Sequence, residues 1–338
     1  MKEVALRILN SAGMRRGVSF GKLLSGESLT RQLVLTLKTS VVPVMSIVAF
    51  LMLWSFAASR ITTSLGQVPG PVMVWDQAKS LWAEHRVERA KEDEFYSRQE
   101  QRNQTKLAKN PNAKVAIMEY TGKPTYIDQI ITSLKTVFMG FIIATVIALP
   151  LGILCGLSPL VMRAFNPLIQ IFKPVSPLAW LPIVTMIVSA VYVTNDGLFA
   201  KSFIISAITV SLCSMWATLI NTALGVASVN TDYINVARVL QLSPLKKTFK
   251  ILLPATLPLI FTGLRISLGV GWMVLIASEM LAQNPGLGKF IWDEFQNGSS
   301  QSLARIMVAV FTIGIIGFFL DRVMVGLQKQ VSFEGRNS

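Results

Sequence analysis

The segment ITSLKTVFMGFIIATVIALPLGILCGL, residues 131–157, decides the fold class of this chain. Its single charged side chain, Lys135, lies near its start. A helix rises 1.5 Å per residue, and about 20 apolar residues cross the ~30 Å hydrocarbon core of a bilayer, so this segment predicts a transmembrane helix. The whole chain agrees, because its 338 residues are 52% hydrophobic and only 15% charged, with a mean hydropathy of +0.53.

Five further apolar segments predict an all-α integral membrane protein with six transmembrane helices. They are residues 41–58, 166–193, 199–226, 257–281 and 303–327. Four prolines in 166–193 predict a kinked or broken helix that neighbouring helices support. The chain is therefore divided into a tail 1–40, a first transmembrane helix 41–58, a mostly helical extramembrane insert 59–130, a five-helix core 131–327 containing a loop 228–254, and a tail 328–338.

The distribution of basic residues predicts the topology. The segments expected inside hold 14 Lys/Arg and four acids: 1–40, 158–165, 227–256 and 328–338. The short loops expected outside hold one Lys/Arg and three acids: 194–198 and 282–302. This positive-inside pattern predicts cytoplasmic N- and C-termini and a periplasmic insert. The polar, Gly- and Pro-free stretch from Trp75 to Lys109 predicts one long solvated helix within the insert.

Several classes of function are excluded by what the sequence lacks. One histidine, His85, and two distant cysteines cannot form a metal site or a His-based triad, so neither a metal nor a catalytic residue is expected. No nucleotide-binding P-loop occurs, since the nearest match, residues 286–290, has Phe where a hydroxyl is needed. The net charge of +14 in so apolar a chain indicates contact with anionic membrane lipid rather than with nucleic acid.

The loop after the fourth span is the most informative stretch. It reads DYINVARVLQLSPLKKTFKILLP, residues 232–254, and consists of two short amphipathic pieces that flank Ser243 and Pro244. Ser at a cap followed by Pro at the first helical position predicts a helix restart. A basic amphipathic helix pair between two spans suits either lipid headgroups or a partner protein.

This loop resembles the cytoplasmic signature of ABC importer permeases: Glu-Ala-Ala, three residues, Gly, nine residues, then Ile-x-Leu-Pro. Ala237, Ile251, Leu253 and Pro254 match that spacing, whereas Asn235, Val236 and Gln241 depart from it. Further segments also resemble the nitrate, sulfonate and taurine permease family over residues 128–330, and most of all its nitrate/nitrite/bicarbonate/cyanate branch. They are 133–141, 174–182, 221–226, 262–266, 279–281 and 285–288.

The resemblance implies a type I ABC importer permease of the bacterial inner membrane. Two permease copies would form the pore with cytoplasmic ATPase subunits, which carry ATP and Mg, and with a periplasmic or lipid-anchored substrate-binding protein. The substrate would be a small anion, nitrate or nitrite first, with bicarbonate, cyanate or an organosulfonate as alternatives. A secondary anion transporter or channel that needs no ATPase is the alternative from another class.

The candidate site residues fall into three groups. The resemblance predicts that the loop couples to an ATPase subunit through Asn235, Val236, Ala237, Arg238, Gln241, Leu242 and Pro244. Charge inside a bilayer is costly and indicates function, and aromatic side chains can line a path, which predicts a substrate pathway of Arg265, Lys173, Lys135, Trp180 and Trp272. Glu279 has the wrong sign to bind an anion and is interpreted as a gate or helix-end residue.

Overall fold

The computed structural model describes residues 29–63, 66–111, 114–115, 117–192, 200–299 and 301–331, with the side chains of 29–40 and 245 left out. The predicted N-terminal tail lies mostly outside the described residues, as do the loop 194–198 and most of the tail 328–338. The chain divides into two compact units, residues 1–73 and 74–338, and each is described by itself.

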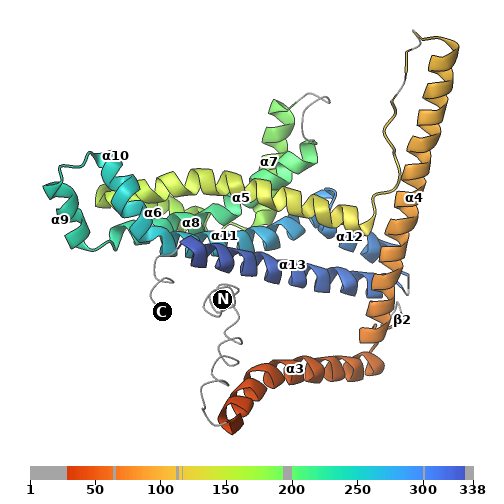
Figure 1. Cartoon of the computed structure of the whole chain (residues 1–338), viewed down its shortest axis with the longest axis horizontal. Helices are drawn as coiled ribbons and strands as arrows, with labels where there is room; N and C mark the ends of the chain where they lie inside the picture. Colours follow the sequence, from red (N-terminus) through yellow and green to blue (C-terminus); the bar gives the residue numbers. More distant parts are fainter. Residues whose placement is uncertain are drawn as a thin grey trace, which may run out of the picture. The chain divides into compact units, whose positions relative to one another are not determined.

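The all-α expectation is confirmed, since helices dominate the described residues and the strands among them are two residues long (Figure 1). The elements are α3 Leu29–Arg60, β1 Thr62–Thr63, β2 Gly66–Gln67, α4 Pro71–Lys109, α5 Tyr126–Leu157, α6 Pro159–Phe172, α7 Pro177–Val191, α8 Lys201–Ala227, α9 Thr231–Val239, α10 Pro244–Lys247, the π-helix η1 Thr248–Leu252, α11 Leu253–Ala282, α12 Leu287–Asn297 and α13 Ser302–Val331.

The first unit contains the first predicted span. Helix α3 includes residues 41–58 and continues to Arg60, where a short antiparallel hairpin of β1 and β2 follows. Val68 N donates to Ile61 O across the base of the hairpin at 3.1 Å. The apolar part of α3, Val41–Arg60, is long enough to cross a bilayer.

The remaining spans fall in the second unit. Four of its helices pass as membrane spans: Tyr126–Leu157, Lys201–Ala227, Thr248–Ala282 and Ser302–Val331. The third predicted span is broken, as its prolines indicated, because α6 and α7 meet at a bend of 100°. Its start was misplaced, since α6 begins at Pro159 with Ser158 as its N-cap, and the residues taken for the loop 158–165 are helical. The described chain thus has five spanning helices, or six if the bent pair is one span.

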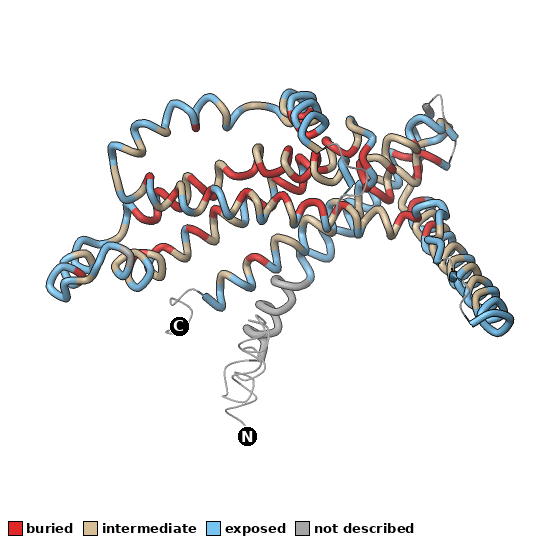
Figure 2. Tube along the Cα trace, turned by 90° about the horizontal axis from the view of Figure 1, so that it is seen from above, coloured by how far each residue is buried: buried red, intermediate tan, exposed pale blue. Residues whose placement is uncertain are grey.

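Helix α8 lies at the centre of the second unit and packs against α5, α7 and α11. Helix α5 approaches it closely because small residues recur every four positions along the facing stripe: Gly140, Ala144, Ala148, Gly152 and Gly156. A Cβ at Gly152 would lie only 2.7 Å from the Thr222 Cβ. Such small-residue stripes let membrane helices pack by van der Waals contact. Buried residues concentrate in these helices, whereas α9 and α10 are largely exposed (Figure 2).

Hydroxyl groups join α8 to α11 across this core. The Ser267 Oγ donates to Ser214 O at 2.6 Å and lies 2.7 Å from the Thr218 Oγ1. Both partners on α8 and Ser267 on α11 are buried. Interhelical hydrogen bonds of this kind satisfy polar groups that lipid cannot, so they fix the position of α11 against α8.

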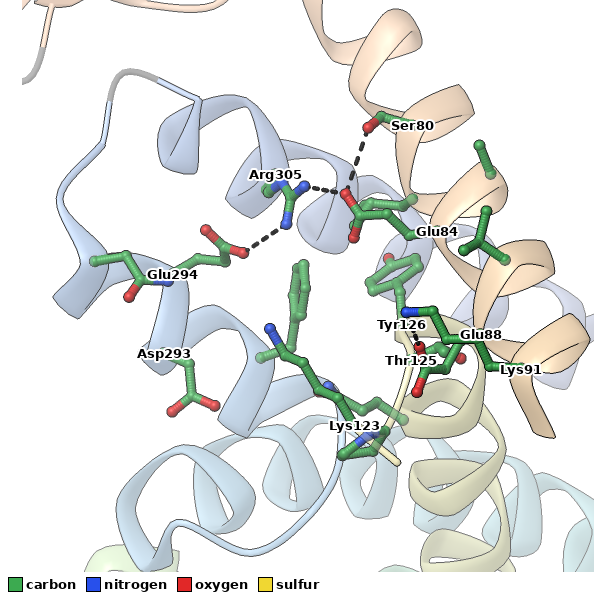
Figure 3. A pocket seen from close by; sticks show the side chains of 17 residues that line it. Ser80, Glu84, Glu88, Lys91, Lys123, Thr125, Tyr126, Asp293, Glu294 and Arg305 are labelled. Atoms are coloured by element: carbon green, nitrogen blue, oxygen red, sulfur yellow. Dashed lines mark hydrogen bonds and ion pairs between the residues drawn. The ribbon is translucent and has the colours of Figure 1, made fainter. Parts of the chain in front are cut away.

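The insert is dominated by α4, which begins four residues before the predicted Trp75 and ends at the predicted Lys109. Its first half is attached by charged contacts to α12 and to the start of α13 (Figure 3). Arg305 of α13 bonds to both Glu84 of α4 and Glu294 of α12. The cavity beside these contacts measures 440 Å³, and Lys123 and Tyr126 also line it.

A second set of contacts ties α4 to the start of α5. Arg89 Nη2 donates to the Asp128 Oδ2 at 2.7 Å, and the His85 Nδ1 lies 2.7 Å from the Thr125 Oγ1. Thr125 and Asp128 cap each other's backbone in a capping box that opens α5. His85 is therefore half-buried and has a partner in Thr125.

Candidate functional site

The loop 228–254 folds into two short helices joined by a tight turn. Helix α9 begins after Asn230, whose side chain accepts from Asp232 N at 2.9 Å. Helix α10 begins at Pro244, and the Ser243 Oγ accepts from Lys246 N at 3.4 Å, so the predicted restart at Ser243 and Pro244 is confirmed.

The turn between these helices depends on Gln241, which stands at the glycine position of the permease signature. Its φ of 48° lies in the left-handed region. Gln241 N donates to Arg238 O and Leu242 N donates to Ala237 O, each at 3.0 Å, which is the pattern of a helix end of the Schellman type. A Cβ in this conformation costs about 1–2 kcal/mol relative to glycine. The turn that the signature glycine would favour is thus formed here with a glutamine.

The residues exposed on α9 and the following turn overlap only in part with the predicted ATPase-coupling residues. Asn235, Val236, Arg238, Gln241 and Pro244 are exposed. Leu242 is half-buried and Ala237 is buried, so Ala237 supports the loop from inside and does not offer a contact surface. Three residues outside the predicted set, Tyr233, Val239 and Leu240, are exposed apolar side chains of the same helix and its end. Their apolar character on a short polar helix was the signal that could have identified them.

Arg265 is paired within the bundle, which the sequence analysis did not foresee. Its Nη2 donates to the Asp321 Oδ2 of α13 at 3.1 Å, and its Nε bonds to the Oδ1 of the same carboxylate. The forked guanidinium is therefore already engaged by a planar carboxylate with the geometry that an oxyanion would use. Asp321 lies within the sixth predicted span and was overlooked as an intramembrane charge.

Trp272 lies beside this pair and belongs to the packing between α11 and α13. It is 5% exposed, and its Nε1 donates to Ile313 O at 3.0 Å. With Arg265, Asp321 and Gly317 it lines a void of only 40 Å³. In this structure Trp272 therefore packs between α11 and α13, and its place on a substrate pathway stays a prediction.

Lys173 and Trp180 flank the break between α6 and α7. Lys173 is the exposed C-cap of α6, and its backbone N–H still bonds to Ile169 O at 3.0 Å. The Trp180 ring packs on Phe172 with centroids 5.8 Å apart, and Phe172 stacks on Trp216 at 6.3 Å. Trp180 thus belongs to an aromatic cluster that supports the bend. The side chain of Lys173 stays exposed next to that bend.

Glu279 is buried in the last turn of α11, three residues before the helix ends at Ala282. Its carboxylate accepts from the Ser133 Oγ of α5 at 2.8 and 2.9 Å and from Gly288 N at 2.9 Å. Leu287 N in turn donates to the Ser133 Oγ at 2.9 Å. A carboxylate at the first turn of α12 suits the positive end of that helix. We call this cluster of Ser133, Glu279, Leu287 and Gly288 the junction, because it joins α5, α11 and α12.

A large cavity lies against α5 and contains Lys135. Its volume is 720 Å³, and no Asp or Glu lines it. Lys135 is exposed there and forms no ion pair with a described residue. Polar groups on the wall include Asn284, whose Nδ2 donates to the Ser206 Oγ at 2.6 Å. The remaining lining residues are mostly apolar: Ile131, Thr132, Leu134, Thr136, Phe138, Met139, Ile142, Ala200, Ser202, Phe203 and Pro285.

The predicted pathway residues therefore lie in three places and do not form one site. Arg265 and Trp272 lie between α11 and α13, Lys173 and Trp180 lie at the bend, and Lys135 lies in the cavity. Of the three basic residues, Arg265 has its charge balanced by a carboxylate, while Lys135 faces a space large enough for a small anion. Within the described residues, no group of three His, Cys, Asp or Glu side chains could hold a metal ion.

The loop and the junction lie at opposite ends of the bundle. Helix α11 starts next to η1, which completes the loop, and ends at the junction with α12 (Figure 1). The contacts between α4 and Arg305 lie at the same end as α12. If the bundle spans a bilayer, the loop and the insert are therefore exposed on opposite sides of it.

Known families resemble this chain over the bundle. The family described as "Binding-protein-dependent transport system inner membrane component" matches residues 148–333. The nitrate import permease protein NrtB of Leptolyngbya laminosa is 40% identical over 203 residues, which cover 60% of this chain and 68% of that protein. The bicarbonate transport system permease protein CmpB of Synechocystis sp. is 35% identical over 291 residues, 86% of this chain and 88% of that protein.

A solved structure of the MetNI methionine ABC transporter in an inward-facing conformation shares the fold. It superposes with a TM-score of 0.53 over 61% of this chain and 95% of the matched chain, at 16% sequence identity. At that identity the likeness concerns the fold alone. It agrees with the expectation of a type I importer permease drawn from the sequence.

Proposed function

Because this chain belongs to the family of binding-protein-dependent transport system inner membrane components, we propose that it admits a small inorganic oxyanion, nitrate or nitrite first, through an ATP-driven importer. As a permease subunit it is a transport component with several membrane-spanning helices. ATP hydrolysis is expected on partner subunits, since the sequence lacks a P-loop.

The observation that carries the choice of an anion is Lys135 in a cavity without carboxylates. A negative charge loses hydration when it enters a low-dielectric region, and a fixed positive charge offsets part of that cost. Two unit charges 4 Å apart attract by about 4 kcal/mol at an effective dielectric constant of 20. The exposure of Lys135 to solvent makes this an upper value. Arg265 is a weaker candidate, because an entering anion would have to displace Asp321.

Bicarbonate is the second candidate, because the bicarbonate permease relative matches 86% of this chain. Nitrate and bicarbonate are both planar and singly charged, so Lys135 would attract either one. They differ in that bicarbonate carries a hydroxyl group, which needs a hydrogen-bond acceptor. Cyanate and organosulfonates remain further possibilities for the same cavity.

The assembly we propose follows the family. Two copies of the chain would enclose the pathway, and cytoplasmic ATPase subunits would bind the exposed apolar face of α9: Tyr233, Val236, Val239 and Leu240. A binding protein would deliver the anion on the side of the insert. The N- and C-termini would lie in the cytoplasm, as the distribution of basic residues predicts.

The test is uptake of labelled nitrate by proteoliposomes that hold the complete complex, with unlabelled nitrate or bicarbonate as competitor. We expect Lys135→Gln to lower uptake roughly ten-fold, which corresponds to about 1.4 kcal/mol and lies within the electrostatic upper value. Lys289→Gln is the matched control, because Lys289 is paired with Asp293 on α12 outside the cavity. Uptake by Lys135→Gln equal to that of the control would contradict the role of Lys135, and stronger competition by bicarbonate than by unlabelled nitrate would make bicarbonate the preferred substrate.

A further inference from the structure

The far part of the insert, residues 90–124, extends past the contacts that hold α4 to the bundle. We call it the arm. It consists of the second half of α4 and a segment, residues 114–124, that returns toward α5. Of the described residues of the arm, Lys91, Lys123 and Pro124 line the cavity that it shares with the bundle. The cavity at Lys135 and the loop 228–254 include no residue of the arm, so its surface requires its own explanation.

The return segment is held firmly on α4. The Gln99 side chain accepts from Met118 N at 2.8 Å and donates to Met118 O at 3.3 Å. The Tyr120 hydroxyl donates to the Glu88 Oε1 at 2.8 Å, and this bond holds the pKa of Glu88 below its ordinary value. Tyr120 N donates to the Tyr96 hydroxyl at 3.2 Å. These hydrogen bonds fix the backbone at Met118 against α4, and they therefore limit the directions in which the neighbouring side chains can point.

This positioned segment exposes apolar side chains. Ile117 is 85% exposed and Met118 is 64% exposed, although both backbone groups of Met118 are hydrogen-bonded to α4. Val115 is exposed as well. Single exposed apolar residues are common on proteins, but a cluster displayed on a fixed segment indicates a surface that is covered in use.

The chain before this cluster is basic, although Glu119 follows Met118 directly and is exposed. Residues 101–118 include no Asp or Glu, and their four basic side chains are all exposed: Arg102, Lys106, Lys109 and Lys114. A groove of 480 Å³ runs between α4 and the return segment, and its one acid, Glu94, is already paired with Arg98. The basic residues that line the groove are Lys91, Arg98, Arg102 and Lys106. Lys91 is paired with Glu88 and Arg98 with Glu94, which leaves Arg102 and Lys106 for a ligand. The groove therefore suits a phosphate.

The position of the return segment decides what covers it. Figure 1 shows the return segment on the side of α4 from which α5 leaves, so it faces the direction in which the spans run. It joins α5 at Tyr126, at the end of a span. Apolar side chains flanked by lysines, next to the end of a spanning helix, are characteristic of segments that lie at the bilayer interface.

We propose that the arm rests on the membrane, with Ile117 and Met118 inserted between lipids and its basic residues bound to anionic headgroup phosphates. Lipid accounts for the apolar and the basic features together, because a bilayer interface offers hydrocarbon and phosphate within a few ångströms. An acidic protein would satisfy the basic residues but would leave the apolar cluster without a reason to face the spans. This inference does not depend on which anion the chain transports.

The experiment places an environment-sensitive fluorophore on the arm of the full chain. In a background with Cys155→Ser and Cys213→Ser, a single cysteine replaces Ile117, or Gln101 as the control, and each is labelled after reconstitution into vesicles. Gln101 is exposed and lies on the opposite side of α4 from Gln99, which binds the return segment. We expect the Ile117 label to be quenched by lipids brominated in their chains when the vesicles contain phosphatidylglycerol, and the Gln101 label to stay unquenched.

Removing the positive charges tests the second half of the proposal. Each basic residue near an anionic surface changes the binding constant by about five-fold. The variant Arg102→Gln/Lys106→Gln/Lys109→Gln/Lys114→Gln should therefore lose most of the quenching at the Ile117 label, as should the unaltered arm at high ionic strength. Equal quenching at Ile117 and Gln101, or quenching that is the same in pure phosphatidylcholine, would overturn the proposal. Shielding of the Ile117 label by added binding protein, without lipid quenching, would assign the arm to a protein instead.

Discussion

The junction offers the sharpest test of the packing that the structure shows. The change is Ser133→Ala, which removes one hydroxyl that makes two kinds of contact. The Ser133 Oγ donates to the Glu279 carboxylate and accepts from Leu287 N at 2.9 Å. All three residues are fully buried, so no water can replace the lost partners without opening the junction.

The magnitude follows from these contacts. A buried polar group that loses its hydrogen-bond partner costs about 1–3 kcal/mol of stability. The change leaves the Leu287 N–H without an acceptor and removes one hydrogen-bond donor from the Glu279 carboxylate. The expected loss is therefore roughly 2–4 kcal/mol. This loss corresponds to a fall in Tm of roughly 5–10 °C for a chain of this size.

Ser278, which directly precedes Glu279 on α11, supplies a matched control. It is as deeply buried as Ser133, but its hydroxyl has no hydrogen-bond partner in the structure. Ser278→Ala should therefore change stability by less than about 1 kcal/mol in either direction. The assay is thermal unfolding of the detergent-solubilised complex with both variants side by side. Equal shifts for Ser133→Ala and Ser278→Ala would refute the hydrogen-bond assignment at the junction.

Three further predictions concern the bundle, the loop and the topology. Arg265→Gln should lower the amount of the chain in membranes, because it breaks an ion pair worth about 1.5–3 kcal/mol. The double variant Arg265→Gln/Asp321→Asn should restore that amount. If the double variant is equally depleted, the loss of the pair is not the cause. Val239→Asp should lower transport-coupled ATP hydrolysis while the chain still inserts, and unchanged coupling would remove α9 from the interface. A cysteine that replaces Ser97 should react with an impermeant thiol reagent added outside, and a cysteine that replaces Lys246 should not. The reverse pattern would mean that the membrane topology is opposite to the one predicted.

The spans and the loop could be predicted because their signals are local. Apolar length identified every span, and the prolines of 166–193 indicated the broken helix that α6 and α7 form. The cap at Ser243 and Pro244 indicated where the loop restarts a helix. The start of α6 was misplaced because Ser158 and Pro159 form an N-cap that opens a second helix directly after α5.

The candidate site was harder to predict because it depends on partners far apart in sequence. Arg265 read as a free intramembrane charge until Asp321, 56 residues later, was placed beside it. Trp272 read as a lining residue because nothing local showed that Ile313 O accepts its N–H. Lys135 was judged to lie at a helix end, and only the packing of α5 beside α8 and Asn284 shows the cavity that it faces.

The central claim is that the chain admits an anion only when ATPase subunits act on it. The direct measurement is uptake of labelled nitrate into proteoliposomes that contain this chain with or without the ATPase subunits and the binding protein, with ATP present and ion gradients collapsed. The account predicts uptake that requires ATP and every partner. Uptake by the chain alone, driven by an imposed ion gradient and indifferent to ATP, would contradict it and assign the chain to secondary transporters or channels.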